Sequence, residues 1–200
     1  MIGGFILITI REAQPDDAGQ IAPLIGLIFD EMQLEELEDV PEPDLEQVIT
    51  MAYRTRSYLS GDATTVVAEA DGQVVGVAFG YPGENEERVD EVLRRLSDKS
   101  AAFNAPFEAE SETDGGEWYL DSIAVSPDYQ GHGIGKRLLA ALPAYANRDR
   151  EQVMGLIVDF DNPDAMALYQ RVGFEVVGTR MVGDHQYYHM QRPVRKVVAA

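Results

Sequence analysis

Hydrophobic and polar residues follow two periods along this chain, and each period predicts one kind of element. Alternating or short apolar runs predict strands over residues 6–11, 64–70, 73–81, 119–125, 153–158, 174–181 and 186–191. Apolar residues three and four positions apart predict helices that start near Pro15, span 44–59 and 86–97, and follow Gly133 and Asn162. Pro23 is expected to kink the first helix, and Pro143 to kink or end a later one near 141–142.

These elements indicate one α/β domain spanning residues 1–200. Strands interleaved with helices, with a hairpin signal at Asp71-Gly72, predict a mixed and mostly antiparallel central sheet flanked by helices. The chain is long enough for one hydrophobic core. The charged stretch 84–116 is interpreted as an insertion between the third and fourth strands.

The charge balance narrows the choice of partners. The chain carries 35 acidic and 16 basic residues, a formal net charge of −19, which argues against nucleic acid as a partner. The acidic tract 31–46 has two readings: a solvated surface, which is the more ordinary one, or an attraction for a cationic substrate. No apolar run reaches the length of a membrane span and the N-terminal residues lack a basic region, so we expect no membrane association and a cytoplasmic protein.

The inventory of reactive side chains is short. Cysteine is absent, which excludes disulfides, cysteine-bound zinc and a cysteinyl acyl-enzyme. The three histidines lack the spacing of metal ligands, so no metal is expected.

A glycine-broken loop joins the strand 119–125 to an amphipathic helix. Gly131, Gly133 and Gly135 let backbone N–H groups turn inward, and the helix start adds further unpaired N–H groups and a positive dipole end. Lys136 and Arg137 add positive charge. The loop therefore predicts a phosphate or pyrophosphate site, although it is not a Walker loop. A glycine-rich turn without ligand and a nucleotide-binding module of another fold remain alternatives at this point.

Two motifs in order carry a resemblance to a family. Gln130-x-x-Gly133-x-Gly135, after the strand and Pro127, resembles the acetyl-CoA loop of the GNAT (GCN5-related) N-acetyltransferases. The stretch from Asn162 to Phe174, an asparagine and then a helix with Tyr169 before Gly-Phe, is similar to that family's second signature. The resemblance covers roughly residues 8–193 and is sharp only in these two motifs.

The resemblance implies the GNAT acyl-CoA N-acyltransferase fold, in which the fourth and fifth strands splay apart. It implies transfer of an acetyl group from acetyl-CoA, as cosubstrate, to a primary amine by direct attack in a ternary complex. The acceptor would be a small molecule, cationic if the acidic tract attracts it, or a peptide amine. A homodimer is compatible with the resemblance. The alternative is a non-catalytic acyl-CoA-binding sensor with the same fold.

The resemblance also assigns residues to the cofactor. The pantetheine arm would pair with the backbone of Ile123, Ala124 and Val125 in the splay. Asn162 would hydrogen-bond that arm, cap the following helix, or do both. The pyrophosphate would lie on the loop residues Gln130, Gly131, His132, Gly133, Ile134, Gly135 and Lys136, where His132 is expected to be a filler or weak phosphate neighbour rather than a catalyst.

Tyr169 is the expected general acid, because a phenol titrates near 10 and so stays protonated while a thiolate of pKa about 8.5 forms; ordinary helix packing is its alternative role. Some family members place a glutamate base on the fifth strand where this chain has Ile157. Asp121 is the favoured base, acting directly or through water, with an ion pair to an arginine as its alternative. The other candidates are Glu117 and Asp159. His185, Tyr187, Tyr188 and His189 of the final hairpin would line the acceptor pocket or form an ordinary edge strand.

Overall fold

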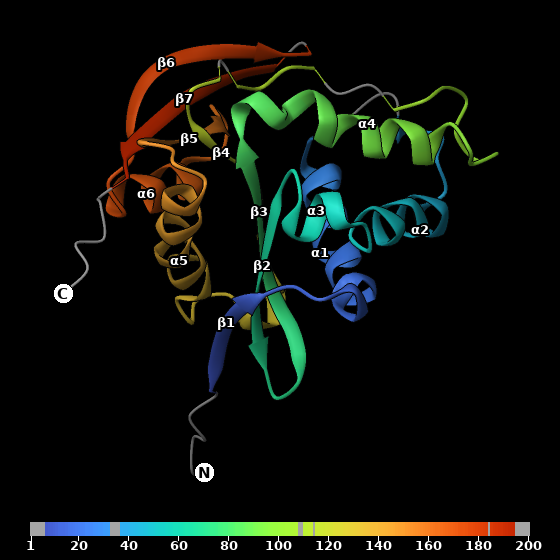
Figure 1. Ribbon diagram of the computed structural model, residues 1–200, viewed down its shortest axis with the longest axis horizontal. Helices are drawn as coiled ribbons and strands as arrows, with labels where there is room; N and C mark the ends of the chain where they lie inside the picture. Colours follow the sequence, from blue (N-terminus) through green and yellow to red (C-terminus); the bar gives the residue numbers. More distant parts are fainter. Residues whose placement is uncertain (1–6, 33–36, 108–109, 114, 184, 195–200) are drawn as a thin grey trace.

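The computed structural model describes residues 7–32, 37–107, 110–113, 115–183 and 185–194. Its centre is a seven-stranded sheet in the order β1-β2-β3-β4-β5-β7-β6 (Figure 1), in which every neighbouring pair is antiparallel except β4–β5. The mixed, mostly antiparallel α/β fold predicted from the sequence is confirmed. The strands are β1 (Ile8–Glu12), β2 (Thr64–Ala70), β3 (Gln73–Pro82), β4 (Trp118–Val125), β5 (Val153–Asp159), β6 (Glu175–Val182) and β7 (His185–Pro193).

Helices cover both faces of the sheet and enclose two hydrophobic clusters. One face carries α1 (Ala18–Met32), α2 (Glu42–Ala52), α3 (Arg56–Ser60) and α4 (Glu86–Ser97), and the other carries α5 (Ile134–Arg148) and α6 (Pro163–Arg171) (Figure 1). The core under α5 and α6 includes Leu138 and Leu142, and the core under α1 includes Ile21 and Ile25. The apolar faces of the helices therefore pack against both faces of the sheet. None of the helices in the described part of the chain is long and apolar enough to cross a membrane.

Two helix boundaries differ from the prediction. The expected helix 44–59 is two helices, because the chain turns after α2 and Thr55 caps α3 by accepting a hydrogen bond from the Tyr58 N–H. Of the expected kink or end near 141–142, the end is wrong, since α5 continues through Pro143 to Arg148.

The reason for the second difference is a side chain from the far end of the chain. Proline has no N–H, so Pro143 leaves the Leu139 carbonyl oxygen without its intrahelical donor. Arg192 of β7 donates to that oxygen at 2.8 Å and to the Val172 carbonyl oxygen at 3.0 Å, while its guanidinium lies 4.7 Å from the Phe174 ring centre. Arg192 therefore satisfies the helix at its proline and ties β7 to α5 and α6.

The two halves of the sheet separate at β4 and β5. These strands pair only at Trp118–Met154 and Tyr119–Gly155. On its other edge β4 follows β3 through Val125, with one extra residue, Asp121, opposite the step from Phe79 to Gly80. Such a bulge bends its strand and increases its twist. We call the unpaired facing segments, Leu120–Val125 of β4 and Leu156–Asp159 of β5, the β4–β5 divergence; the predicted splay is confirmed.

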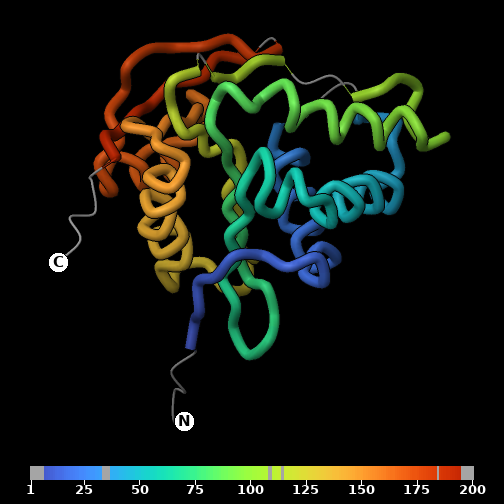
Figure 2. The backbone as a smooth tube through the Cα atoms, viewed as in Figure 1, coloured from blue at the N-terminus to red at the C-terminus, as the bar shows by residue number. Residues whose placement is uncertain are grey.

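The stretch between α4 and β4 packs against distant elements. The smooth tube in Figure 2 shows the chain returning from α4 over one end of the sheet toward β6 and β7. Arg180 of β6 donates to the Ser111 carbonyl oxygen at 3.2 Å, and Glu110 accepts from the Gly183 N–H at 2.9 Å. The described part of the stretch therefore lies beside the site built on β4.

Candidate active site

The loop before α5 presents a row of unpaired donors. Gly131 and Gly133 have φ values of +76° and +74°, a conformation that side chains with a Cβ rarely adopt, and Gly133 starts the helix without a side-chain cap. The first intrahelical bond runs from the Arg137 N–H to the Gly133 carbonyl oxygen at 3.1 Å. Among the described residues, the N–H groups from Gly131 to Lys136 find no acceptor in the protein. Six consecutive free donors at a helix start can bind an anion such as a pyrophosphate.

The side chains of this loop mostly shape it rather than point outward. His132 folds back, its Nδ1 lying 2.9 Å from the Gln130 carbonyl oxygen, and the Gln130 amide donates to the Val125 carbonyl oxygen at 3.4 Å. Ile134 is buried in the core below, whereas Lys136 is exposed. Lys136 is therefore the loop's free charge, since Arg137 donates to the Ile8 carbonyl oxygen of β1.

The β4–β5 divergence lies directly behind the loop. Ile123, Ala124 and Val125 hydrogen-bond with β3 on one edge, and β5 does not pair with them on the other. A Cβ on Gly135 would lie 3.5 Å from the Leu168 side chain and 3.9 Å from the Val125 side chain. The first turn of α5 therefore meets β4 and α6 at the same place, so an extended chain bound to the loop can continue along the free edge of β4.

Tyr169 comes from α6, on the side of β5. Its side chain is 8% exposed and its ring packs 6.0 Å from the ring centre of Phe174. The hydroxyl makes no hydrogen bond within the described residues; because no fully buried polar atom lacks a partner there, the hydroxyl retains contact with solvent. Burial raises the pKa of Tyr169 to about 12, and the charge of Glu31 on α1 adds to the shift. The hydroxyl is thus a protonated donor that has no partner in the described part of the chain.

Asn162 caps α6. Its side-chain oxygen accepts from the Ala165 N–H at 3.1 Å, and its own N–H donates to the Asp159 carbonyl oxygen at 3.1 Å. The amide group of the Asn162 side chain still has two N–H donors to offer. The cap therefore leaves both of these donors available to a cofactor.

Asp121 occupies the β4 bulge on the face covered by α1 and α4. Its carboxylate accepts from the Tyr81 hydroxyl at 3.1 Å and from the Ser122 hydroxyl at 2.6 Å. Burial raises the pKa of Asp121, the two hydrogen bonds oppose the shift, and the charge of Glu86 adds to it. No arginine pairs with it in the described chain, so the ion-pair alternative finds no support and the half-buried carboxylate suits a proton acceptor.

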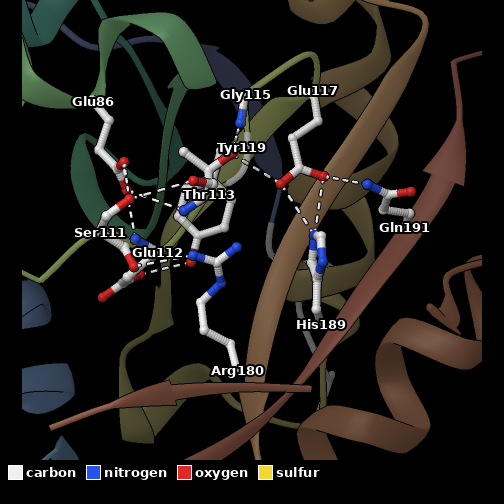
Figure 3. Close-up of polar contacts among 10 residues, drawn as sticks. All are labelled: Glu86, Ser111, Glu112, Thr113, Gly115, Glu117, Tyr119, Arg180, His189 and Gln191. Carbon is white, nitrogen blue, oxygen red and sulfur yellow. Dashed lines mark hydrogen bonds and ion pairs between the residues drawn. The ribbon is translucent and has the colours of Figure 1, made fainter. Parts of the chain in front are cut away.

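The other two base candidates have different surroundings. Glu117 is fully buried and accepts from Thr113, His189 and Gln191 (Figure 3). Burial would raise the pKa of Glu117, but these hydrogen bonds outweigh it and lower the pKa below its usual value. Asp159 accepts from the Asp161 N–H at 2.7 Å in the turn after β5. Both carboxylates are occupied by structural contacts.

The aromatic and histidine residues of the final hairpin have different surroundings. His189 is buried against Glu117, whereas the Tyr188 ring stacks on Phe160 at 3.8 Å between ring centres. His185 is exposed, with its Nδ1 3.8 Å from Asp159. These residues lie on β7, which pairs with both β5 and β6, so the expected edge strand is wrong and the strand is an interior one. Its buried His189 holds Glu117 just before β4.

Three carboxylates near Asp121 escaped the sequence reasoning. Glu86 and Asp90 come from α4, and Glu112 from the stretch before β4. Burial and the charges of Asp121 and Glu86 raise the pKa of Asp90 to about 7. Their only sequence signal was membership of a charged insertion, a pattern typical of a solvated surface. No set of three metal-ligating side chains converges to hold a metal ion among residues whose positions are described.

Comparison with known proteins identifies the family. The model of the acetyltransferase (GNAT) family matches residues 29–174, well over half of the chain. The chain therefore belongs to the GNAT acetyltransferase family, as its two motifs suggested. The family supports an acyltransferase activity.

Named acetyltransferases are similar to part of the chain. The N-alpha-acetyltransferase RimI of Mycobacterium tuberculosis is 45% identical over 74 residues, which are 37% of this chain and 42% of the relative. A mycothiol acetyltransferase of Saccharomonospora viridis is 48% identical over 65 residues, 32% of this chain and 20% of the relative. The chain thus matches less than half the length of these relatives.

Solved structures match over nearly the whole chain. A crystal structure described as an acetyltransferase is 39% identical, has a TM-score of 0.81, and covers 94% of this chain and all of its own. YncA of Salmonella typhimurium, solved with its cofactor acetyl-CoA, shares the fold at 21% identity and a TM-score of 0.61, covering 96% of each chain. The fold of this chain is therefore that of GNAT acetyltransferases.

Proposed function

We propose that this protein transfers an acetyl group from acetyl-CoA to a primary amine, and that the acceptor attacks directly in a ternary complex. The observation that supports the proposal most is the placement of the six free N–H groups of Gly131–Lys136 at one end of the β4–β5 divergence. The free edge of Ile123–Val125 continues from them. A diphosphate with an extended arm fits such a row of donors followed by an unpaired strand edge.

Two residues of this chain then take part in separate proton-transfer steps. Acetyl-CoA supplies an activated acetyl thioester. Asp121 takes a proton from the acceptor ammonium, so that the N–H bond breaks and the nitrogen keeps its electron pair for attack. The Tyr169 hydroxyl donates to the sulfur as the C–S bond breaks, and the second amine proton ends on the thiol. Because the pKa of Tyr169 is raised to about 12, complete proton transfer to a thiolate near 8.5 is uphill by roughly 5 kcal/mol, so hydrogen bonding to the sulfur is its main contribution.

The acceptor is a cationic amine, either a small molecule or a peptide amine. Asp121 and Glu86, together with a partly ionised Asp90, give the face of β4 under α4 a negative potential that favours an ammonium group. Part of the acidic tract 31–46, which first suggested a cation, lies outside the described residues, at 33–36. The partial matches to RimI and to a mycothiol acetyltransferase are compatible with both acceptor types.

The experiment is release of free thiol from acetyl-CoA with a panel of peptides, polyamines, aminoglycosides and neutral or acidic amino acids. We expect turnover with cationic primary amines. Tyr169→Phe should lower kcat about 10²-fold or more and leave the Kd for coenzyme A unchanged, the usual scale for a general acid. Asp121→Asn should lower kcat on a similar scale and remove the acidic limb of the pH profile.

Tyr145→Phe is the matched control, because Tyr145 lies about 17 Å along α5 from Ile134 at 1.5 Å per residue and packs under Arg148. A Tyr169→Phe protein as active as this control would remove the proposed acid. Binding of acetyl-CoA with no thiol release for any amine would instead favour the non-catalytic sensor. Neutral or acidic amino acids that outperform every polycation would exclude a cationic acceptor.

A further inference from the structure

Two tyrosine–carboxyl pairs lie side by side on β3 and β4. The Tyr119 hydroxyl donates to Glu112 at 2.6 Å, and the Tyr81 hydroxyl donates to Asp121 at 3.1 Å. Tyr81 and Tyr119 are cross-strand partners whose ring centres lie 5.8 Å apart, and both rings are buried. The bulge at Asp121 places its carboxyl group on the face that these rings occupy. The two carboxyl groups are therefore held by neighbouring phenols.

Hydrogen bonds to the backbone hold the segment that carries Glu112 in place. The Glu86 carboxylate of α4 accepts from the Glu112 N–H at 2.6 Å, from the Thr113 N–H at 3.1 Å and from the Ser111 hydroxyl at 2.6 Å (Figure 3). Arg180 of β6 holds the Ser111 carbonyl oxygen. Contacts from α4 and β6 thus fix this stretch so that the half-buried Glu112 side chain meets Tyr119.

The groups around Glu112 are mainly acidic. Burial raises the pKa of Glu112 to about 8, the charges of Asp121, Glu86 and Asp90 add to the shift, and the Tyr119 hydrogen bond opposes it. The pKa of about 8 keeps Glu112 protonated at neutral pH. Asp121 accepts hydrogen bonds from two hydroxyls, which favour its charged form, whereas Glu112 accepts from one. Of two carboxyl groups in one low-dielectric space, Glu112 is therefore the one that holds the proton. The nearby positive charge of Arg180 reaches the segment at Ser111.

We propose that Glu112 and Asp121 act as one electrostatically coupled carboxyl pair, in which the positioning residue Glu112 sets the total charge that the pair presents to the acceptor amine. The pair holds one negative charge at neutral pH, which matches one ammonium group. Above neutral pH Glu112 loses its proton to solvent and the pair holds two charges, so a cationic acceptor binds more tightly. This role rests on the acetyltransferase function proposed above.

The titration of Glu112 can be measured without any turnover. Carboxyl ¹³C NMR of protein labelled at glutamate and aspartate side chains would follow each group from pH 4 to 10. We expect one glutamate to titrate near pH 8 and its signal to vanish in Glu112→Gln. Asp121→Asn should move that titration to lower pH by at least one unit, because a like charge is removed. Tyr119→Phe should move it to higher pH, because the opposing hydrogen bond is lost.

Glu87→Gln is the control, since Glu87 is exposed on the same helix as Glu86; it should leave the titration in place. Either of two results would overturn the proposed pair. One is a measured pKa of Glu112 within one unit of that of an ordinary glutamate. The other is a Glu112 pKa that does not change in Asp121→Asn. These outcomes do not depend on acetyl transfer.

The kinetic readout uses a lysine-like amine, which stays protonated to pH 9 because its ordinary pKa is about 10.4. Between pH 7 and 9 the wild-type KM for this amine should fall about tenfold with little change in kcat, since one added charge attracts the ammonium across a partly solvated site. In Glu112→Gln only the smaller fall that the ionisation of Asp90 brings should remain. A KM that falls equally in both proteins overturns the charge-setting role. Shifted titrations without thiol release for any amine would overturn the proposed function and, with it, the acceptor's part in this inference.

Discussion

Gly155→Ala tests the close packing of Gly155 against Glu117 at the end of the β4–β5 divergence where the two strands still pair. Gly155 pairs with Tyr119 at the last point where β4 and β5 hold together. A Cβ added there would lie 1.9 Å from one carboxylate oxygen of Glu117 and 2.2 Å from its carboxyl carbon. Glu117 is fully buried and cannot swing into solvent, so the methyl group must displace a carboxylate that three side chains hold.

The cost follows from those contacts. Displacement weakens the hydrogen bonds from His189 at 3.1 Å and Gln191 at 2.7 Å, and hydrogen bonds to a charged group contribute about 1.5–3 kcal/mol each. We expect Gly155→Ala to lower the free energy of unfolding by about 3 kcal/mol or more. Glu117→Ala should cost about 3–5 kcal/mol, because it leaves those buried donors without their acceptor.

The double variant decides whether the two costs share one cause. With Glu117 reduced to alanine, the methyl group added by Gly155→Ala enters vacated space, so the double variant should be no less stable than Glu117→Ala alone. Urea unfolding followed by circular dichroism would then give a coupling of about 3 kcal/mol. Gly178→Ala on β6 is the control, because nothing lies within 4 Å of its added Cβ. Additive losses of about 6–8 kcal/mol would refute the steric argument.

Three further changes have defined outcomes. Between pH 5 and 8 folding should become less stable by about 2 kcal/mol through Asp90, whose folded pKa of about 7 exceeds its unfolded value so that stability falls as pH rises. In denaturant titrations Asp90→Asn should remove this part of the slope and leave the part that Glu112 contributes. Gly133→Ala, at a φ of +74°, should strain the loop by about 1–2 kcal/mol and weaken coenzyme A binding in calorimetry about tenfold. Arg192→Met should destabilise the protein by about 2–3 kcal/mol by leaving the Leu139 carbonyl oxygen without a donor, and by less in a Pro143→Ala background, which restores an N–H.

Features set by neighbouring residues in the chain could be predicted. The strands and most helices follow from local periodicity, and the turn at Gly131 and Gly133 follows from glycine spacing. Asn162 and Tyr169 stand in one short motif, so their shared helix was predictable, whereas their contacts with acetyl-CoA stay predictions. The sheet class was accessible because alternating strands and helices admit few arrangements.

Features set by distant residues could not be predicted. Pro143 should end a helix on local grounds, yet an arginine on the last strand supplies a donor to the oxygen that the proline leaves free. The break between α2 and α3 was missed for a smaller reason, since Thr55 looked like one polar position in a helix and is a cap. In both cases a single hydrogen bond decides the boundary, and apolar periodicity carries no record of it.

Glu112 and Glu117 show why chemical roles need the structure. Both residues are glutamates of the stretch that leads into β4, and the sequence offered Glu117, but not Glu112, as an alternative to Asp121 for the base. Three side-chain donors surround Glu117, and they lower its pKa despite burial; Glu112 has one phenol and several carboxylates around it, and its pKa rises. A buried carboxylate that accepts many hydrogen bonds is held charged, whereas one among like charges keeps its proton and can exchange it near neutral pH. The number of donors that the fold delivers, rather than the residue type, therefore separates the structural glutamate from the one suited to acid–base chemistry.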